Sequence, residues 1–352
     1  MAAPRFHTAT VTRIDRTTRD AVAVTLRPDT PEAFAFKAGQ YLTFRRQIGE
    51  VELRRSYSIC APEGDGALRV GIKHVPGGAF SGWANTELRV GDSLQVMPPM
   101  GQFTLPETAG RHLLFVAGGS GITPILSLIG TLLRQDGAAQ ATLIYANRSP
   151  ASIMFRDALE DLKNLYLDRL TVIHVLESGQ DIPLFSGRLD AEKCAALFTR
   201  WIALDQVDAS YICGPGPMRE AVASALAAHG QPEDRIRFEL FAADQPGKLA
   251  PAPRHVAPDA PGIATQITVG GIRQDLIVAQ DQSLLEAARA ADIDAPFACT
   301  AGVCSTCRAR VLRGEVEMRA NHALEDDQVR DGYILTCQSY PVSGPLEIDY
   351  DA

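Results

Sequence analysis

The chain has 352 residues, of which 46% are hydrophobic and 22% are charged. This length and composition are typical of a globular protein of two or three domains. The net charge of −8 argues against nucleic-acid binding, and no stretch stays apolar for long enough to predict a membrane span.

Residues 1–106 have the pattern of a small antiparallel β domain. Residues that favour β-strands alternate with polar ones in Thr8–Ile14 and Ala21–Leu26, and turns containing glycine or proline separate the runs. Many short strands at this spacing predict a β-barrel.

Three segments of this domain could bind a flat, phosphorylated cofactor. In Arg54–Ser58, Tyr57 can stack on a planar ring while Arg55 neutralises a phosphate. In Gly71–Ser81, the glycines allow close backbone approach, and Ser81 begins a predicted helix whose N–H groups could hold a pyrophosphate. The third segment is Pro98–Phe103.

Residues 107–243 change character, because apolar strand runs now alternate with helical patterns. This alternation predicts a parallel sheet with crossover helices. The first strand, Leu113–Ala117, leads into the turn Gly118–Pro124 and then a helical pattern over Ile125–Leu133. A glycine turn between strand and helix places a phosphate on the helix N-terminus. Pro124 suits the first helical turn.

Two later strands of this domain also end in polar or glycine-rich turns. Ala141–Ala146 is followed by Asn147, Arg148 and Ser149. An arginine at this position accommodates a ribose 2′-phosphate, so we expect NADPH; the alternative is a solvated Arg148 and the use of NADH. The strand Ala209–Cys213 runs into Gly214 and Pro215. By itself, Cys213 could be a small buried filler.

Residues 244–264 contain five prolines and no periodicity, which predicts a partly stiff linker. Such a linker could let the last module swing. Residues 265–352 then form that module. A hairpin is expected over Gln266–Val278 with its turn at Gly270 and Gly271, and Ser283 with Glu286 forms a capping box at a helix start.

Four cysteines of this module have the spacing C-x4-C-x2-C…C: Cys299, Cys304, Cys307 and Cys337. This is the plant-type ligand pattern for a 2Fe–2S cluster. A zinc site is the alternative, but zinc sites more often use C-x2-C pairs. The remaining Cys60, Cys194 and Cys213 are odd in number, which argues against a disulfide framework. The free thiols predicted as cluster ligands favour a reducing cytoplasm.

The last module is also acidic. Residues 265–352 contain 14 Asp and Glu against 7 Arg and no Lys, which leaves a charge of only about −1 for the rest of the chain. This surface could dock a basic protein partner, with the densest acidic run at Glu325–Asp327; the alternative is that the acidity serves solubility alone.

Together these motifs resemble the ferredoxin–NADP reductase superfamily, followed by a plant-type ferredoxin. Their order is similar to that of the reductase components of multicomponent oxygenases. Among these, the resemblance is strongest to the reductase components of aryl-CoA epoxidases. The resemblance implies an antiparallel FAD-binding β-barrel (1–106), a doubly wound parallel α/β domain for NAD(P) (107–243), the linker, and an α+β ferredoxin of the β-grasp type (265–352). It also implies FAD, a 2Fe–2S cluster and NADPH, or else NADH.

The resemblance further implies roles for individual residues. Ser58, Cys213 and Glu239 would lie at the reacting rings, with Phe241 near the flavin. The four cysteines would hold the cluster. The remaining cofactor contacts would come from Arg55, Ser56, Tyr57, Ile72, Lys73, Gly78, Ser81, Gly119, Ser120, Gly121, Thr123, Pro124, Arg148, Ser149, Gly214 and Pro215.

The implied function is an NAD(P)H-dependent reductase that passes electrons through FAD and the cluster to an oxygenase of aromatic or aryl-CoA type. A flavin is needed because a nicotinamide gives up two electrons together whereas the cluster takes one at a time. Two alternatives stay open. The acceptor could be a hybrid-cluster protein or another non-oxygenase, or the chain could be a non-catalytic electron carrier or redox sensor.

Overall fold

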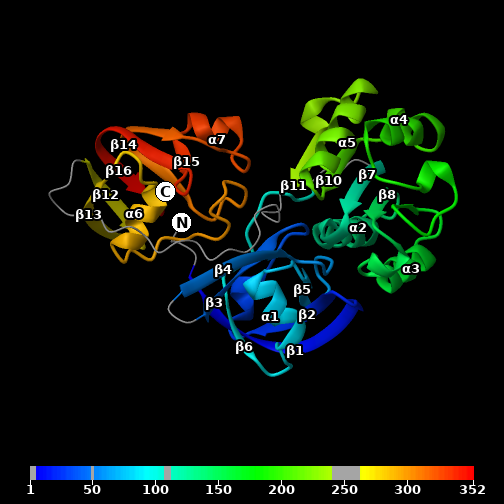
Figure 1. Ribbon diagram of the computed structural model, residues 1–352, viewed down its shortest axis with the longest axis horizontal. Helices are drawn as coiled ribbons and strands as arrows, with labels where there is room; N and C mark the ends of the chain where they lie inside the picture. The colour runs from blue at the N-terminus through cyan, green and yellow to red at the C-terminus, as the bar shows by residue number, and fades with distance from the viewer. Residues whose placement is uncertain (1–4, 49–50, 107–111, 240–261) are drawn as a thin grey trace.

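The computed structural model describes residues 5–48, 51–106, 112–239 and 262–352. Figure 1 shows three lobes, each built on its own sheet, with the first lobe below and the other two above it on either side. The expected linker lies almost wholly outside the described residues, and so does Phe241. None of the helices in the described ranges is long and apolar enough to cross a membrane.

The first lobe is a closed antiparallel sheet of six strands in the order β4-β3-β6-β1-β2-β5. A bridge between Ile59 and Val70 joins the two ends of this order. The predicted barrel is therefore confirmed. One helix, α1, buries Phe80 and Ala84 in the barrel core. The elements are β1 His7–Thr18, β2 Ala21–Pro28, β3 Tyr41–Ile48, β4 Val51–Ser58, β5 Leu68–Lys73, β6 Ser93–Val96 and α1 Ala79–Thr86.

The second lobe has a five-stranded sheet in the order β11-β10-β7-β8-β9, and all its neighbours are parallel. Helices α2 and α3 share one apolar cluster with the sheet, and α4 and α5 share another, so helices cover both faces. The predicted doubly wound fold is confirmed. Its elements are β7 His112–Gly118, β8 Gln140–Asn147, β9 Leu170–Leu176, β10 Ala209–Cys213, β11 Ile236–Glu239, α2 Ile122–Gln135, α3 Arg156–Leu165, α4 Ala191–Arg200 and α5 Gly216–Ala228.

Helix α2 joins the first two lobes. It begins at Ile122, three residues before the predicted start, because a short 3-10 turn at Gly119–Gly121 leads straight into it. Its residues are buried from Ile122 to Leu133, since one side packs on the sheet and the other on the barrel. Ser127 donates to the carbonyl of Ala61 at 2.6 Å, which ties the helix to the barrel.

The third lobe has a mixed five-stranded sheet in the order β13-β12-β16-β14-β15, in which only β12 and β16 are parallel. Helix α6 packs its apolar side into the core of this lobe. The expected hairpin and the Ser283–Glu286 capping box are both confirmed. The elements are β12 Ile263–Val269, β13 Ile272–Val278, β14 Arg308–Met318, β15 Tyr333–Leu335, β16 Ser339–Asp349, α6 Leu284–Ala290 and α7 Asp326–Arg330.

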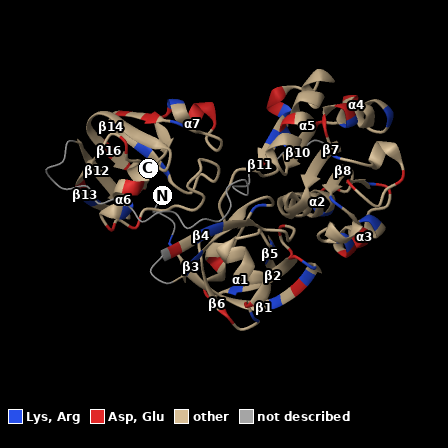
Figure 2. Ribbon diagram, in the orientation of Figure 1, with Lys and Arg blue, Asp and Glu red and all other residues tan. Residues whose placement is uncertain are grey.

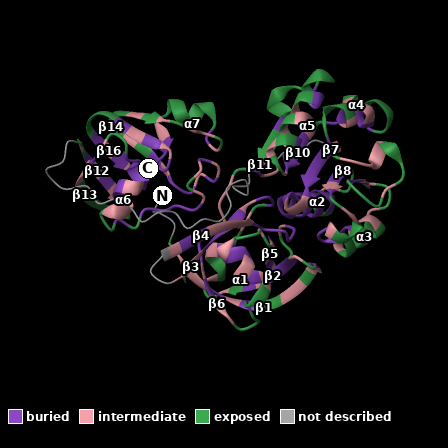
Figure 3. Cartoon of the chain, in the orientation of Figure 1, coloured by how far each residue is buried: buried purple, intermediate pink, exposed green. Residues whose placement is uncertain are grey.

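The buried residues follow this division into lobes. Figure 3 shows buried segments along the central strands of each sheet and along α2, while the outer sides of α3, α4 and α7 are exposed. A smaller apolar cluster joins Tyr41 of the barrel to Ala298 and Cys304 of the third lobe. The third lobe therefore contacts the barrel close to two predicted cofactor sites.

Candidate functional site

The residues of the predicted flavin motif lie on β4, where neighbouring side chains point to opposite sides of the strand. Tyr57 is half-buried and contacts Phe80 of α1, with ring centroids 5.5 Å apart. Arg55 is half-buried and donates to the carbonyl of Arg54 at 2.7 Å. The hydroxyl of Ser56 is hydrogen-bonded to Thr43 at 3.0 Å, and Ser58 is buried at the end of the strand.

The second flavin segment leads from β5 into α1. The helix begins at Ala79 with Gly78 as its N-cap, so Ser81 stands inside the first turn rather than opening it. The Ser81 hydroxyl accepts from the Val75 N–H at 3.1 Å and donates to the Gly78 carbonyl, which fixes the loop. A Cβ on Gly78 would fall 2.5 Å from this hydroxyl. The bare backbone here suits close approach of a pyrophosphate.

Two glycine turns meet at the carboxyl ends of β7 and β10, which are neighbouring parallel strands. A Cβ on Gly121 would stand 2.1 Å from the carbonyl oxygen of Cys213, and one on Gly214 would stand 3.1 Å from the Cα of Gly118. Gly119 has a φ of 53°. Two bare backbone turns at one end of a parallel sheet are the setting in which α/β folds hold nucleotides.

The other residues predicted in this turn support its shape. Thr123 is buried and donates to the carbonyl of Ser120 at 3.0 Å, and Pro124 is buried in the first turn of α2. Ser120 itself is half-buried. The barrel touches the turn here, since a Cβ on Gly71 of β5 would stand 2.6 Å from the Thr123 methyl group. The predicted flavin and nucleotide sites are thus adjacent.

Lys73 lies on the barrel side of the same junction. It is half-buried at the end of β5, and its Nζ atom is 3.9 Å from the place a Cβ would take on Gly119. Ile72 beside it is buried in the barrel core. The Lys73 ammonium group could therefore form an ion pair with a phosphate bound between the two domains.

Cys213 and Glu239 are paired in the register of β10 and β11. Cys213 is fully buried, and burial, with Glu239 as the second cause, raises the pKa of its thiol well above the ordinary value. The thiol therefore stays protonated and neutral at physiological pH. Pro215 follows as the N-cap of α5. A neutral thiol beside a carboxylate can position a ring but cannot act as a thiolate nucleophile.

Arg148 and Ser149 follow β8. The Arg148 side chain is exposed and, among the described residues, makes no ion pair. Its backbone is fixed, because its carbonyl accepts from both the N–H and the hydroxyl of Ser178. The N–H of Ser149 donates to the Ser152 hydroxyl at 3.0 Å. Nearby, Glu177 is 3.4 Å from Arg188, so its charge is already paired.

The four predicted cluster ligands form two thiol pairs. Hydrogen bonding with Cys304 lowers the pKa of Cys299, and hydrogen bonding with Cys307 lowers that of Cys337. In the described ranges no three His, Cys, Asp or Glu side chains converge on one point that could hold a single ion. These four thiols match the four-cysteine ligand set of a 2Fe–2S cluster.

The loop around these thiols turns its N–H groups inward. The N–H of Ala301 donates to the Cys299 sulfur at 3.3 Å, and the N–H of Cys299 donates to the Cys304 sulfur at 3.4 Å. Gly302 has a φ of 76°, and a Cβ there would stand 3.0 Å from the Ala320 carbonyl oxygen. Hydrogen bonds to sulfur are the contacts that tune an iron–sulfur centre, so the loop fits the cluster.

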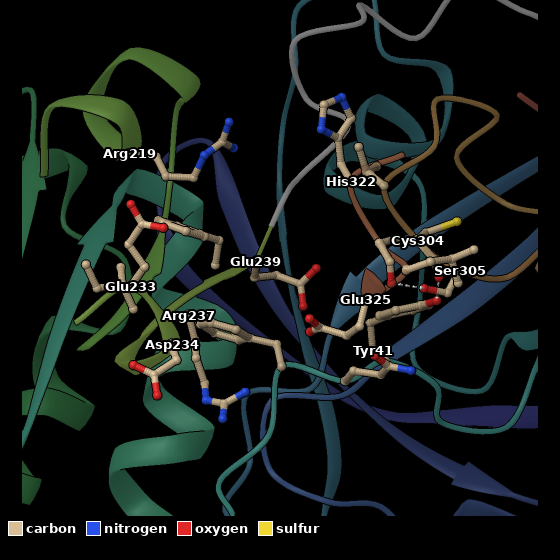
Figure 4. Close-up of a pocket in the computed structure, with 18 residues that line it drawn as sticks. Tyr41, Arg219, Glu233, Asp234, Arg237, Glu239, Cys304, Ser305, His322 and Glu325 are labelled. Atoms are coloured by element: carbon tan, nitrogen blue, oxygen red, sulfur yellow. Dashed lines mark hydrogen bonds between the residues drawn. The ribbon is translucent and has the colours of Figure 1, made fainter. Parts of the chain in front are cut away.

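A groove of about 490 Å³ lies where the three lobes meet. Tyr41 of the barrel, Glu239 of β11 and Cys304 of the cysteine loop all line it. Figure 4 shows the Glu239 and Glu325 carboxylates pointing toward each other across it, and Arg219 and Arg237 on the side of the second lobe. Tyr41 was not among the residues predicted from the sequence, and no local motif marks it.

Comparison with known families assigns each lobe. Residues 8–105 match the model of the oxidoreductase FAD-binding domain, residues 115–224 that of the oxidoreductase NAD-binding domain, and residues 267–342 that of the 2Fe-2S iron-sulfur cluster binding domain. These matches confirm the predicted cofactors, FAD, a nicotinamide nucleotide and a 2Fe–2S cluster.

Relatives with all three domains share nearly the whole chain. One subunit of the 1,2-phenylacetyl-CoA epoxidase from Escherichia coli (strain K12) is 39% identical, with 99% of this chain and 98% of the relative covered. The ferredoxin reductase component of 3-ketosteroid-9-alpha-monooxygenase from Mycobacterium tuberculosis (strain CDC 1551 / Oshkosh) is 35% identical, with coverage of 91% and 87%. The solved structure of phthalate dioxygenase reductase has the same fold, with 23% identity, a TM-score of 0.60 and 98% of both chains covered.

Proposed function

Since the chain belongs to the family of oxygenase reductase components with FAD-binding, NAD-binding and 2Fe-2S domains, we propose that its partner is an oxygenase acting on an aryl-CoA thioester. The support for this substrate class is the 39% identity to the phenylacetyl-CoA epoxidase subunit over nearly all of both chains. The relatives compared above serve oxygenases, which favours an oxygenase over a hybrid-cluster protein as the acceptor.

The observation that carries the electron route is the groove shared by Tyr41, Glu239 and Cys304. It brings the end of the nucleotide-binding sheet, the flavin-binding barrel and the cysteine loop to one place. When bound, FAD accepts a hydride from the nicotinamide and releases single electrons, and the 2Fe–2S cluster accepts them one at a time. The chain supplies binding, orientation and exclusion of water.

The residues of the chain would divide this work between them. Arg55 and the N-terminus of α1 would hold the flavin phosphates, and Tyr57 with Ser58 would position its ring. Gly119 would leave room for the nucleotide, and Gly121 lets its turn pack against the Cys213 carbonyl. The protonated Cys213 would keep the nicotinamide pocket free of a second negative charge beside Glu239. The four cysteines, in their two pairs, would ligate the cluster.

We infer that the nucleotide is NADPH rather than NADH. Arg148 is exposed at the carboxyl end of β8 with Ser149 and Ser178 beside it, where a ribose 2′-phosphate would be bound. The nearby carboxylate, Glu177, is paired with Arg188 and is therefore less suited to accept from a free 2′-hydroxyl.

The oxygenase is proposed to dock on the acidic side of the third lobe. Figure 2 shows acidic residues gathered at α7, where Glu325, Asp326 and Asp327 are all exposed. This segment adjoins the cysteine loop, because Ser305 donates to the Ala323 carbonyl at 3.1 Å. A basic partner attracted to α7 would therefore come close to the cluster.

Reduction of the reconstituted holoenzyme by NADPH tests this function. We expect flavin and cluster absorbance to bleach together, and an aryl-CoA oxygenase to turn over only when this protein is added. In Cys304→Ser, flavin reduction should persist within about twofold, while electron delivery to the oxygenase falls by at least about 100-fold, because a thiolate ligand is lost. Loss of flavin reduction as well would contradict the modular scheme.

A further inference from the structure

A charged side chain is buried between the barrel and the third lobe. Arg54 of β4 is only 4% exposed although it carries a positive charge. Its Nη2 atom is 3.2 Å from Asp294 Oδ1, and its Nη1 donates to the carbonyl of Ala295 at 3.4 Å. Both partners belong to the segment that leads into Cys299. Arg54 thus binds the third lobe just ahead of the first predicted cluster ligand.

Aromatic rings and a carboxylate complete the surroundings of Arg54. Its guanidinium lies 4.0 Å from the ring centroid of Phe297 in the third lobe and 4.9 Å from that of Phe6 in the barrel. Its Nε donates to Glu52 at 2.7 Å. A buried arginine is tolerated only with such a set of partners, and removing it would leave several of them unpaired. Each of the two lobes contributes to the set.

A second contact lies on the neighbouring strand. Tyr41 of β3 is 5% exposed, and its hydroxyl donates to the carbonyl of Cys304 and lies 3.1 Å from the hydroxyl of Thr306. Its ring packs in a small apolar cluster with Met100, Ala298 and Cys304. The barrel therefore holds the backbone of a predicted cluster ligand directly.

The strand ladder joins both contacts to the predicted flavin site. Tyr41 is the register partner of Ser58, and Arg54 is followed on β4 by Arg55 and Tyr57. Because adjacent side chains on a strand point to opposite sides, Arg54 can bind the third lobe while Arg55 faces the flavin side. A displacement of the third lobe would have to break contacts made by β4, which carries the flavin motif, and by its neighbour β3.

We propose that Tyr41 and Arg54 form an interdomain clamp that holds the cysteine loop against the flavin barrel in the position where electrons cross. They are positioning residues: Arg54 seats Asp294–Phe297, and Tyr41 fixes the backbone at Cys304. Neither gains or loses an electron. Their effect is on the gap between the flavin and the cluster, and electron transfer slows steeply as such a gap widens. The proposal rests on the FAD-to-cluster route given above.

The test separates the two electron transfers in stopped-flow experiments on the holoenzyme. In Arg54→Ala, we expect flavin reduction by NADPH to stay within about twofold of wild type, and cluster reduction to slow about tenfold or more, because a buried charged hydrogen-bond donor is lost. Arg54→Lys should restore part of the rate. Tyr41→Phe and Asp294→Ala should each slow cluster reduction about threefold, since an exposed ion pair or one hydrogen bond contributes less.

A structural readout and a matched control accompany the rates. Hydrogen exchange in residues 292–298 of the oxidised holoenzyme should become faster in Arg54→Ala. Arg46 provides the control, because its guanidinium lies 3.8 Å from the Trp83 ring centroid, both within the barrel. Arg46→Ala removes the same kind of stack from the neighbouring strand, and should change neither cluster reduction nor exchange in this segment.

Two results would overturn the clamp. One is wild-type cluster reduction and wild-type exchange in Arg54→Ala, and the other is an equal loss of flavin reduction, which would place Arg54 in the flavin site instead. If Arg54→Ala does not fold, Asp294→Ala replaces it, because the Asp294 side chain is 79% exposed and its loss should not prevent folding. Wild-type rates of cluster reduction in both Asp294→Ala and Tyr41→Phe would then refute the clamp. Failure of wild type itself to reduce its cluster would count against the electron route rather than the clamp.

Discussion

At the scale of single residues, two adjacent arginines have different environments. Arg54 is buried between two lobes with two acidic partners and two aromatic rings, whereas Arg55 is half-buried on the other side of the same strand. Because successive side chains of a β-strand point to opposite sides, the same type of side chain can contact the third lobe at one position and face the flavin site at the next. Arg148 is a third case, exposed at a strand end where a phosphate can reach it.

The role of Arg148 is measurable with two nucleotides. Arg148→Ala should raise KM for NADPH about tenfold or more, because a charge-assisted hydrogen bond is worth about 1.5–3 kcal/mol. KM for NADH should change by less than about twofold, since NADH has no 2′-phosphate for the arginine to bind. Steady-state kinetics with both nucleotides gives the ratio. Arg200→Ala, at the exposed end of α4, is the control and should leave both values unchanged. Equal changes for both nucleotides would contradict the 2′-phosphate role.

At the scale of elements, the close packing of two turns at the carboxyl end of the parallel sheet depends on glycines. The turn after β7 and the turn after β10 approach so closely that a single methyl group on Gly121 would overlap the carbonyl of Cys213. The same contact shapes the predicted nicotinamide pocket. We therefore expect both folding and nucleotide binding to require a glycine at this position.

Gly121→Ala tests that demand. Overpacking of this kind costs roughly 1–3 kcal/mol, and the neighbour here is backbone, which cannot rotate away. We expect a lower free energy of unfolding in urea and a weaker affinity for NADPH. Gly137→Ala, in the loop after α2, is the matched control, because a Cβ there meets no atom within 4 Å. Wild-type stability and affinity in Gly121→Ala would show that the two turns can separate freely.

At the scale of the whole molecule, the barrel and the nucleotide domain share one apolar cluster, while the third lobe meets the barrel through a smaller set of contacts. Figure 1 shows α7 at the top of this third lobe, on the side that faces the second lobe. Asp326 and Asp327 are exposed to a partner, whereas Glu325 also lines the groove that the cysteine loop faces.

Salt dependence tests docking on the acidic segment. The rate of electron transfer to the oxygenase should fall several-fold between about 0.05 and 0.5 M NaCl, because salt screens charges on separate molecules. Neutralising Glu325, Asp326 and Asp327 to Gln or Asn should lower the rate at low salt and flatten this dependence. Neutralising Glu192, Asp205 and Glu220, which are exposed on the second lobe, is the control and should leave the salt dependence intact. A rate that changes neither with salt nor on neutralisation of the α7 residues would refute docking at this site.

The sequence by itself determined the three-part fold and the cluster, because these rest on local spacing: alternation for the barrel, a glycine turn between strand and helix, and C-x4-C-x2-C for the cluster. The FAD and the nicotinamide nucleotide were predicted from the resemblance of the motifs to a known superfamily. Only the tertiary structure decided that Gly121 packs on Cys213, and that Tyr41 binds Cys304, a residue 263 positions away along the chain. Local patterns record which element a residue belongs to. They do not record which residues meet across two lobes, since that depends on how three separately folded sheets pack together.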